Sequence, residues 1–266
     1  MSGKLLSIKG LRIHDRAGNR LVDGVSLELY DDEFVGIVGE SGSGKSLTAR
    51  ALLHAVPSGL SVHYDEYEVF NQQIASLADQ KKRELIGKKI GFVPQNTIAF
   101  LHPFLKVKQQ IGDGYQYHFK KGKHESLKKA KELLKKVGIQ DPERVLNAYP
   151  FELSGGMKQR VQIASALMTD PELIIADEPT TALDTVHQRQ VMNLFSDLNQ
   201  KEQIPILFIS HDLHIIRKYC QRVYVMHNGK IVESGPTEKV FTHPEHEYTK
   251  TLIASTLFLT ETGTVQ

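Results

Sequence analysis

The chain has 266 residues, which is enough for one large α/β domain or two small ones. Hydrophobic residues make up 40% and charged residues 24% of the sequence, as in globular proteins that bury a core. The formal net charge of +2 is too small to hold nucleic acid along a whole face. A single cysteine, Cys220, excludes an internal disulfide and is expected to be a small buried residue after a helix.

Hydrophobic runs are short throughout the chain. No stretch reaches the roughly 18 apolar residues that a membrane-spanning helix needs. Charged and polar residues interrupt the N-terminus at 1–11, so it lacks the apolar centre of a signal peptide. The sequence therefore predicts a protein that is made in the cytoplasm and stays there.

Period-two alternation comes first along the chain and predicts an antiparallel hairpin layer. The turn-like residues 16–19 precede the clearest stretch, in which apolar positions alternate with polar ones: Val25, Leu27 and Leu29 against Ser26, Glu28 and Tyr30. An apolar strand over 34–38, a glycine loop and a helix over 45–55 follow. Further strands are expected at 90–93, 173–176, 206–209 and 223–226. Helical patterns separate most of them, which is typical of a largely parallel sheet covered on both faces.

Between Gln95 and Ser154 the sequence becomes polar, rich in lysine and helix-forming. Leu127, Ala130, Leu134 and Val137 share one helical face, so we expect a mostly helical insertion into the α/β core. The lysines between Lys120 and Lys136 are best explained as a solvated helix face. A patch for lipid headgroups or nucleic acid is the alternative.

The strongest motif is the segment from Gly39 to Ser46, which fits the phosphate-loop pattern G-x-x-x-x-G-K-[ST] between a buried strand and a helix. Its glycines let backbone N–H groups converge on phosphate oxygens, and the helix N-terminus adds a partly positive charge. Lys45 would bridge the β- and γ-phosphates, and the Ser46 hydroxyl would bind Mg²⁺. This loop alone does not distinguish a kinase, a GTPase and a transport ATPase.

Two acids, Asp177 and Glu178, end the apolar strand predicted at 173–176. Parallel sheets bind ligands at the carboxyl ends of their strands. Asp177 suits the Mg²⁺ shell, and Glu178, one residue on, can polarise the attacking water.

A second helix start with glycines occurs in Leu153-Ser154-Gly155-Gly156-Met157-Lys158-Gln159. Ser154 is the expected cap, and Met157, Val161, Ala164 and Met168 form an apolar face. The chain thus has two helix starts suited to an anion, whereas one active site needs one. We interpret the second as serving a nucleotide held by a partner chain.

With these segments the sequence resembles the ABC ATPase family over nearly its whole length. The ordered set is Gly39–Ser46 (Walker A), Gln95 (Q-loop), Leu153–Gln159 (signature), Leu173–Glu178 (Walker B), Ala182-Leu183-Asp184 (D-loop) and His211 (switch histidine). The resemblance implies an α/β fold: a RecA-like P-loop core with a mainly parallel sheet, an N-terminal antiparallel β layer and an inserted helical subdomain. The expected domain bounds are 1–95 and 160–235 for the core, 96–159 for the helical subdomain and 236–266 for a helical tail.

The resemblance also implies ATP and Mg²⁺ as cofactors and gives each motif a role. Catalysis would involve Glu178, His211 and Gln95, and Mg²⁺ would be bound by Ser46, Gln95 and Asp177. Nucleotide contacts are expected from Gly39, Glu40, Ser41, Gly42, Ser43, Gly44, Lys45, Ser46, Leu47, Ser154, Gly155, Gly156, Asp184 and His14. His14 is included because the family stacks adenine on an aromatic residue where this chain has Asp15. An ordinary surface histidine is the alternative.

Further matches are to the peptide and nickel uptake branch of the family. They lie at 101–111, where His102 replaces the usual asparagine, at 149–152, and in a tail with Phe241, Pro244, His246, Tyr248, Thr249 and Leu252. In length the chain looks more like the nickel or metallophore members, which leaves the solute open. The expected partners are a second, different ABC ATPase subunit, two membrane permeases and an extracytoplasmic solute-binding protein. The expected place is the cytoplasmic face of the cell membrane.

Two rival functions lie outside transport. An ABC protein acting on ribosomes would carry two cassettes, and only one is present here. A DNA-repair or chromosome ATPase would interrupt the cassette with long coiled coils or zinc motifs. The stretch from Gln95 to Ser154 leaves no room for the former, and one cysteine excludes a cysteine-rich zinc module.

Overall fold

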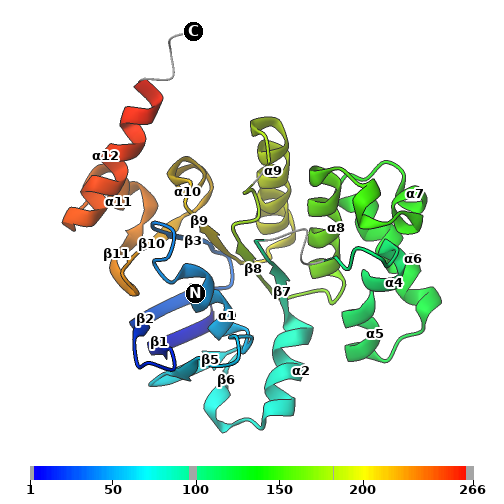
Figure 1. Cartoon of the computed structure of the whole chain (residues 1–266), viewed down its shortest axis with the longest axis horizontal. Coiled ribbons are helices and arrows are strands. Elements are labelled where there is room, and N and C mark those ends of the chain that lie inside the picture. The colour runs from blue at the N-terminus through cyan, green and yellow to red at the C-terminus, as the bar shows by residue number, and fades with distance from the viewer. Residues whose placement is uncertain (1–2, 96–100, 182, 262–266) are drawn as a thin grey trace. The chain divides into compact units, whose positions relative to one another are not determined.

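The computed structural model describes residues 3–95, 101–181 and 183–261, with backbone alone for 256–261. The chain forms two compact units (Figure 1): Met1–Leu77 together with Pro205–Gln266, and Ala78–Ile204. It therefore leaves the first unit after Leu77 and returns at Pro205. The predicted division into core, helical subdomain and tail cuts the chain at other points and remains a prediction.

An antiparallel sheet opens the first unit, as the period-two pattern predicts. β1 (Lys4–His14) pairs with β2 (Arg20–Tyr30), with β4 (Ser61–His63) and with β5 (Glu66–Val69), and β5 pairs with β6 (Gln72–Gln73). Apolar side chains of β1 and β2 are fully buried, among them Leu6, Ile8, Leu27 and Leu29. Burial of this one face provides the main stabilisation of the layer.

A second sheet of the first unit is mainly parallel. β3 (Phe34–Val38) lies between β9 (Ile206–Ser210) and β10 (Arg222–His227), parallel to both, and β11 (Lys230–Pro236) is antiparallel to β10. β3 and β9 are buried along their whole lengths, which is expected of strands covered on both faces.

The described helices of the first unit are α1, α10, α11 and α12, with a short 3₁₀ turn, η1. Their bounds are Lys45–Leu52, Leu213–Tyr219, Thr237–Thr242, Glu247–Glu261 and, for η1, Ile74–Ser76. Cys220 directly follows α10 and is buried, as predicted.

The predicted end of α1 at Ala55 is wrong, because the helix stops at Leu52. His54 has a left-handed backbone with φ of 50°. The N–H of Ala55 donates to the carbonyl of Arg50 at 2.9 Å, and that of His54 donates to Ala51 at 3.1 Å. These bonds form a Schellman motif, which satisfies carbonyls at the end of the helix and turns the chain away.

Parallel strands β7 (Ile90–Val93) and β8 (Leu173–Asp177) belong to the second unit. α2 (Asp79–Lys89) leads into β7, and a mostly helical segment separates the two strands, as predicted. The described helices of this unit beyond α2 are α4 (Val107–Gln110), α5 (Asp113–Phe119), α6 (Lys123–Lys136), α7 (Pro142–Asn147), η2 (Pro150–Glu152), α8 (Gly155–Leu167) and α9 (Thr185–Glu202).

Helix α8 buries more than the single apolar face that the sequence predicts. Val161 and Ala164 are buried as expected, but so are Gln159 and Gln162. The Gln162 amide donates to the carbonyl of Pro94 at 2.9 Å. This bond ties the helix to the residue that precedes Gln95.

Among the described residues, no helix combines the length and hydrophobicity required to cross a bilayer.

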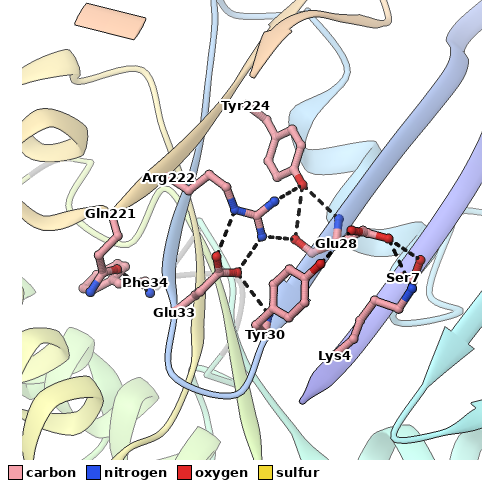
Figure 2. A network of polar contacts seen from close by, with 9 residues as sticks. All are labelled: Lys4, Ser7, Glu28, Tyr30, Glu33, Phe34, Gln221, Arg222 and Tyr224. Atoms are coloured by element: carbon pink, nitrogen blue, oxygen red, sulfur yellow. Dashed lines mark hydrogen bonds and ion pairs between the residues drawn. The ribbon is translucent and has the colours of Figure 1, made fainter. Parts of the chain in front are cut away.

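Arg222, the first residue of β10, connects the two sheets of the first unit (Figure 2). Its Nε donates to a carboxylate oxygen of Glu33 at 3.0 Å, and its other guanidinium nitrogens donate to the Tyr224 hydroxyl and to the Glu28 carbonyl at 2.8 Å. Burial lowers the pKa of the Arg222 guanidinium, but its hydrogen bonds to Glu33 and Tyr224 and the charges of both partners together outweigh burial, so the pKa is raised.

Candidate functional site

The phosphate-loop residues leave the buried end of β3 and enter α1, as predicted. Lys45 is 4% exposed, and its ammonium donates to the carbonyls of Gly39 at 2.8 Å and Glu40 at 2.7 Å. Glu40, Ser41 and Gly42 are exposed, whereas Ser46 and Leu47 in the first turn of α1 are partly exposed. The loop thus forms a ring closed by the lysine, with its outer backbone open to a ligand.

Glycine is required at two places in this loop. A Cβ on Gly39 would lie 2.0 Å from the carbonyl oxygen of Met226, the backbone of the neighbouring strand β10. Gly44, directly before α1, has a left-handed backbone with φ of 101°. Gly229 also donates its N–H to the Ser43 carbonyl at 3.1 Å. The turn after β10 therefore holds the loop close to the sheet.

His211 belongs to the same edge of the same sheet. Val38 and Ser210 are partners in the parallel pairing of β3 with β9, so the phosphate loop and His211 leave neighbouring strands at corresponding positions. Asp212 caps α10 by accepting from the N–H groups of His214 and Ile215. The cap holds the backbone beside His211, whose side chain is exposed.

In the second unit, Gln95 and Glu178 come together. Val93 of β7 pairs with Ala176 of β8, and just beyond this pair the Gln95 amide donates to a Glu178 carboxylate oxygen at 2.9 Å. The Thr181 hydroxyl donates to the same oxygen at 3.0 Å. Asp177 is 2% exposed, whereas Glu178 is partly exposed with a left-handed φ of 46°.

The signature segment has the helix start that the sequence predicts. Ser154 caps α8, and its hydroxyl accepts from the N–H of Met157 at 3.3 Å. Ser154 and Gly155 are exposed, and a Cβ on Gly155 would meet no atom within 4 Å. The open backbone can approach an anion closely.

Asp184 of the D-loop caps α9, while Ala182 of the same motif lies outside the described residues. The Asp184 carboxylate accepts from the N–H of Val186 at 3.1 Å and of His187 at 2.9 Å. It also contacts Nδ1 of His187 at 2.6 Å. The backbone and side-chain bonds from His187 lower the pKa of Asp184.

His187 is a residue that the sequence interpretation missed. Its Cδ2 lies 3.1 Å from where a Cβ on Gly156 would stand, so it links Asp184 to the signature helix. A histidine three residues after an aspartate is a weak sequence signal for this arrangement, because aspartate is common at helix starts for capping alone.

His14 ends β1, beside Ser61 of β4, and its ring lies 6.3 Å from that of His63. Asp15, at the position where the family has an aromatic residue, organises the turn that follows. Its carboxylate accepts from the N–H groups of Ala17 at 2.8 Å and Asn19 at 2.9 Å. Asp15 therefore has a structural role, and the adenine contact of His14 stays a prediction.

The residues expected to bind Mg²⁺ suit a hard cation in their chemistry. Asp177 offers a buried carboxylate at the end of a strand, and Ser46 offers a hydroxyl at a helix start. Among the residues that the structure describes, no group of three or more His, Cys, Asp or Glu side chains could hold a metal by itself. Mg²⁺ in nucleotide sites is bound through one or two carboxylates plus substrate phosphates, so such a group is not needed.

Comparison with known proteins places this chain in a family. The ABC transporter family matches residues 22–181. A peptidoglycan transport ATP-binding protein of Agrobacterium fabrum is 43% identical, over 94% of this chain and 47% of the relative. A probable peptide ABC transporter ATP-binding protein of Sinorhizobium fredii is 40% identical, over 94% and 76% of the two chains. The oligopeptide transport ATP-binding protein OppD of Bacillus subtilis is also 40% identical, over 98% and 74%. This chain thus spans less than half of the first relative.

Solved structures similar to this chain are also ATP-binding proteins of the ABC type. A dimeric ATP-binding cassette in a post-hydrolysis state, bound to ADP and phosphate, has a TM-score of 0.76 and 28% identity, over 88% of this chain and 99% of that one. The cassette cbiO1 of Clostridium perfringens, part of an ABC transporter complex, has a TM-score of 0.74 and 27% identity, over 97% and 99%.

The chain belongs to the ABC transporter family. It is an ATP-binding, ATP-hydrolysing cassette, and the predicted RecA-like P-loop fold is confirmed. The relatives named above are transport proteins, and none of them is named for action on ribosomes or DNA.

Proposed function

We propose that this cassette drives an importer for peptides, with nickel or metal-chelate complexes as the alternative cargo. The names of the relatives support peptides, because they refer to peptides, oligopeptides and peptidoglycan. The partners would be a second ABC ATPase subunit, two membrane permeases and a solute-binding protein. The cassette would then work at the cytoplasmic face of the membrane through its contacts with the permeases.

In the proposed site, the phosphate loop from Gly39 to Leu47 surrounds the phosphates with N–H groups. Lys45 leaves its two carbonyl partners for the β- and γ-phosphates. Ser46 and Asp177 hold Mg²⁺, with Gln95 as a further contact. Held by these residues, Mg²⁺ would supply positive charge against the phosphates. His14 lies beside adenine.

Glu178 is the proposed general base for the attacking water, and its carboxylate is oriented by Gln95 and Thr181. His211 contacts the γ-phosphate. Ser154, Gly155 and Gly156 bind the nucleotide of the partner ATPase, and Asp184 communicates across that interface. Loss of the γ-phosphate weakens this second contact, so hydrolysis releases the pair and drives the transport cycle.

The observation that carries the proposal is the Gln95–Glu178 hydrogen bond of 2.9 Å. Gln95 follows β7 and precedes, in the sequence, the helices that begin with α4. A partner that moves these helices would move the amide bound to the catalytic carboxylate, and so couple transport to hydrolysis.

The test is ATP turnover in liposomes that contain the assembled transporter and its binding protein. Peptides of different lengths and nickel chelates are added one class at a time. We expect peptides to stimulate turnover severalfold. Stimulation by nickel chelates alone would replace the peptide assignment, and turnover indifferent to every solute and to the permeases would contradict a role in import.

A further inference from the structure

The C-terminal helix reaches the phosphate loop through one side chain. Tyr248, in the first turn of α12, accepts a hydrogen bond at its hydroxyl from the N–H of Glu40 at 3.0 Å. The two residues are 208 positions apart in the sequence. The sequence predicts no role for Tyr248 beyond its place in the tail pattern.

The Glu40 N–H belongs to the same peptide group as the Gly39 carbonyl. That carbonyl accepts from the Lys45 ammonium at 2.8 Å. A peptide group is planar, with its N–H and C=O pointing to opposite sides. Tyr248 therefore holds one edge of the plane whose other edge holds Lys45.

Tyr248 is itself firmly placed. Its ring stacks on His227, the last residue of β10, with 3.8 Å between ring centroids and 24° between planes. The carboxylate of Glu233 on β11 accepts from the N–H groups of Glu245 at 2.9 Å and His246 at 3.0 Å, which fixes the start of α12. Strands β10 and β11 thus fix the position of the hydroxyl.

A fixed peptide matters because Lys45 is almost completely buried. A buried ammonium needs acceptors at defined positions. When Lys45 moves from the Gly39 carbonyl to phosphate oxygens, the bond from Glu40 to Tyr248 can keep the peptide from rotating. The loop then stays open for the nucleotide and the lysine can return on release.

We propose that Tyr248 is a positioning residue for ATP binding that acts through the Gly39–Glu40 peptide and Lys45. The C-terminal helix is then part of the ATPase rather than an appendage. This inference rests on the phosphate-binding role proposed above for Lys45.

The test starts with Tyr248→Phe in the full chain, which removes one oxygen and keeps the ring stacked on His227. Because the chain has no tryptophan, binding is followed with a fluorescent ATP analogue and competition by ATP in the presence of Mg²⁺. We expect ATP affinity to fall roughly threefold to tenfold, the effect of one neutral hydrogen bond. Tyr117→Phe, at an exposed tyrosine of α5, is the matched control and should bind ATP as the wild type does.

A double-mutant cycle with Lys45→Ala then separates positioning from a general structural effect. If Tyr248 acts through Lys45, Tyr248→Phe should weaken binding less than about twofold in the Lys45→Ala background. Unchanged affinity in Tyr248→Phe, or an equal loss in both backgrounds, would overturn the inference. If Lys45→Ala bound ATP as tightly as wild type, the proposed phosphate site itself would fail, which is a distinguishable result.

Discussion

Asp177 and Glu178 are neighbours with different surroundings. Asp177 is the last residue of β8 and is buried, whereas Glu178 turns into a left-handed conformation and accepts bonds from Gln95 and Thr181. A carboxylate held by an amide and a hydroxyl has a defined direction and keeps lone pairs for a water molecule. The proposed metal ligand and the proposed base are therefore separated by a single change of backbone direction.

The first prediction is that Glu178→Gln lowers ATP turnover by about 10² to 10⁴, as loss of a general base does. ATP binding should persist, because the substitution keeps the size of the side chain and leaves the phosphate loop intact. Steady-state turnover of the assembled transporter and ATP titration of the same preparation measure the two effects.

Glu172→Gln is the matched control, because Glu172 directly precedes β8 at the strand's other end and pairs with Lys89 at 2.9 Å. It should hydrolyse ATP at the wild-type rate. Near-normal turnover in correctly assembled Glu178→Gln protein would remove Glu178 from the role of base.

At the scale of elements, two helix N-termini are proposed to bind phosphate. α1 begins after the partly exposed Gly44, and α8 begins after the exposed Ser154. Each start offers backbone N–H groups to an anion. One start lies in the first unit and the other in the second. Since a cassette needs one phosphate loop for its own nucleotide, the start of α8 is free to serve another chain.

The second prediction concerns this helix start. Ser154→Arg should spare ATP binding by the chain's own phosphate loop and prevent closure over the partner's nucleotide, because a bulky cation replaces a hydroxyl where the backbone must approach closely. Loss of the cap should also reduce stability by about 1 kcal/mol. Nucleotide trapped at each site of the mixed ATPase pair is the measurement.

Ser76→Arg makes the same change at an exposed residue of η1, at the end of the first chain segment of unit one. Both sites of the pair should close normally in this control. If Ser154→Arg instead abolished binding at its own phosphate loop while the partner's site closed, the arrangement between chains would be refuted.

At the scale of the whole molecule, the first unit is built from the two ends of the chain. Strands β1, β2 and β3 come before the chain segment that forms the second unit, and β9, β10 and β11 come after it. Arg222 on β10 bonds to Glu28 and Glu33, which are 194 and 189 residues away. This contact joins the antiparallel sheet to the parallel one.

The third prediction is that Arg222→Met lowers the free energy of unfolding by about 2 kcal/mol. The methionine fills most of the volume but leaves Glu33 without its cation. The expected loss is below that for a fully buried pair, because the Arg222 and Glu33 side chains keep 21% and 19% of their exposure. Urea unfolding of the full chain measures it.

Arg83→Met, on the exposed surface of α2, is the control and should leave the urea midpoint unchanged. A second control is the double variant Arg222→Met, Glu33→Gln. Its loss of unfolding free energy should be smaller than the sum of the losses in the two single variants, because each single variant breaks the same ion pair. An unchanged midpoint in Arg222→Met would show that the network does not stabilise the sheets.

Much of the architecture could be predicted from short stretches of sequence. The strands at 34–38 and 90–93 have the predicted bounds, and the glycine loop lies between β3 and α1 as its motif requires. Ser154 is found at a helix start, as predicted. These features depend on period, capping residues and backbone freedom, all of which act between residues a few positions apart.

Tertiary structure decided which distant residues come into contact. The Schellman turn at His54 shortened α1, and β7 and β8 brought Gln95 to Glu178, 83 residues away. The bond from Glu40 to Tyr248 and the pairing of Arg222 with Glu33 had no local signal. Such contacts follow from sheet order and the paths between strands, which periodicity does not encode. Local patterns thus determined the elements and the chemistry, whereas packing decided which side chains support the phosphate loop.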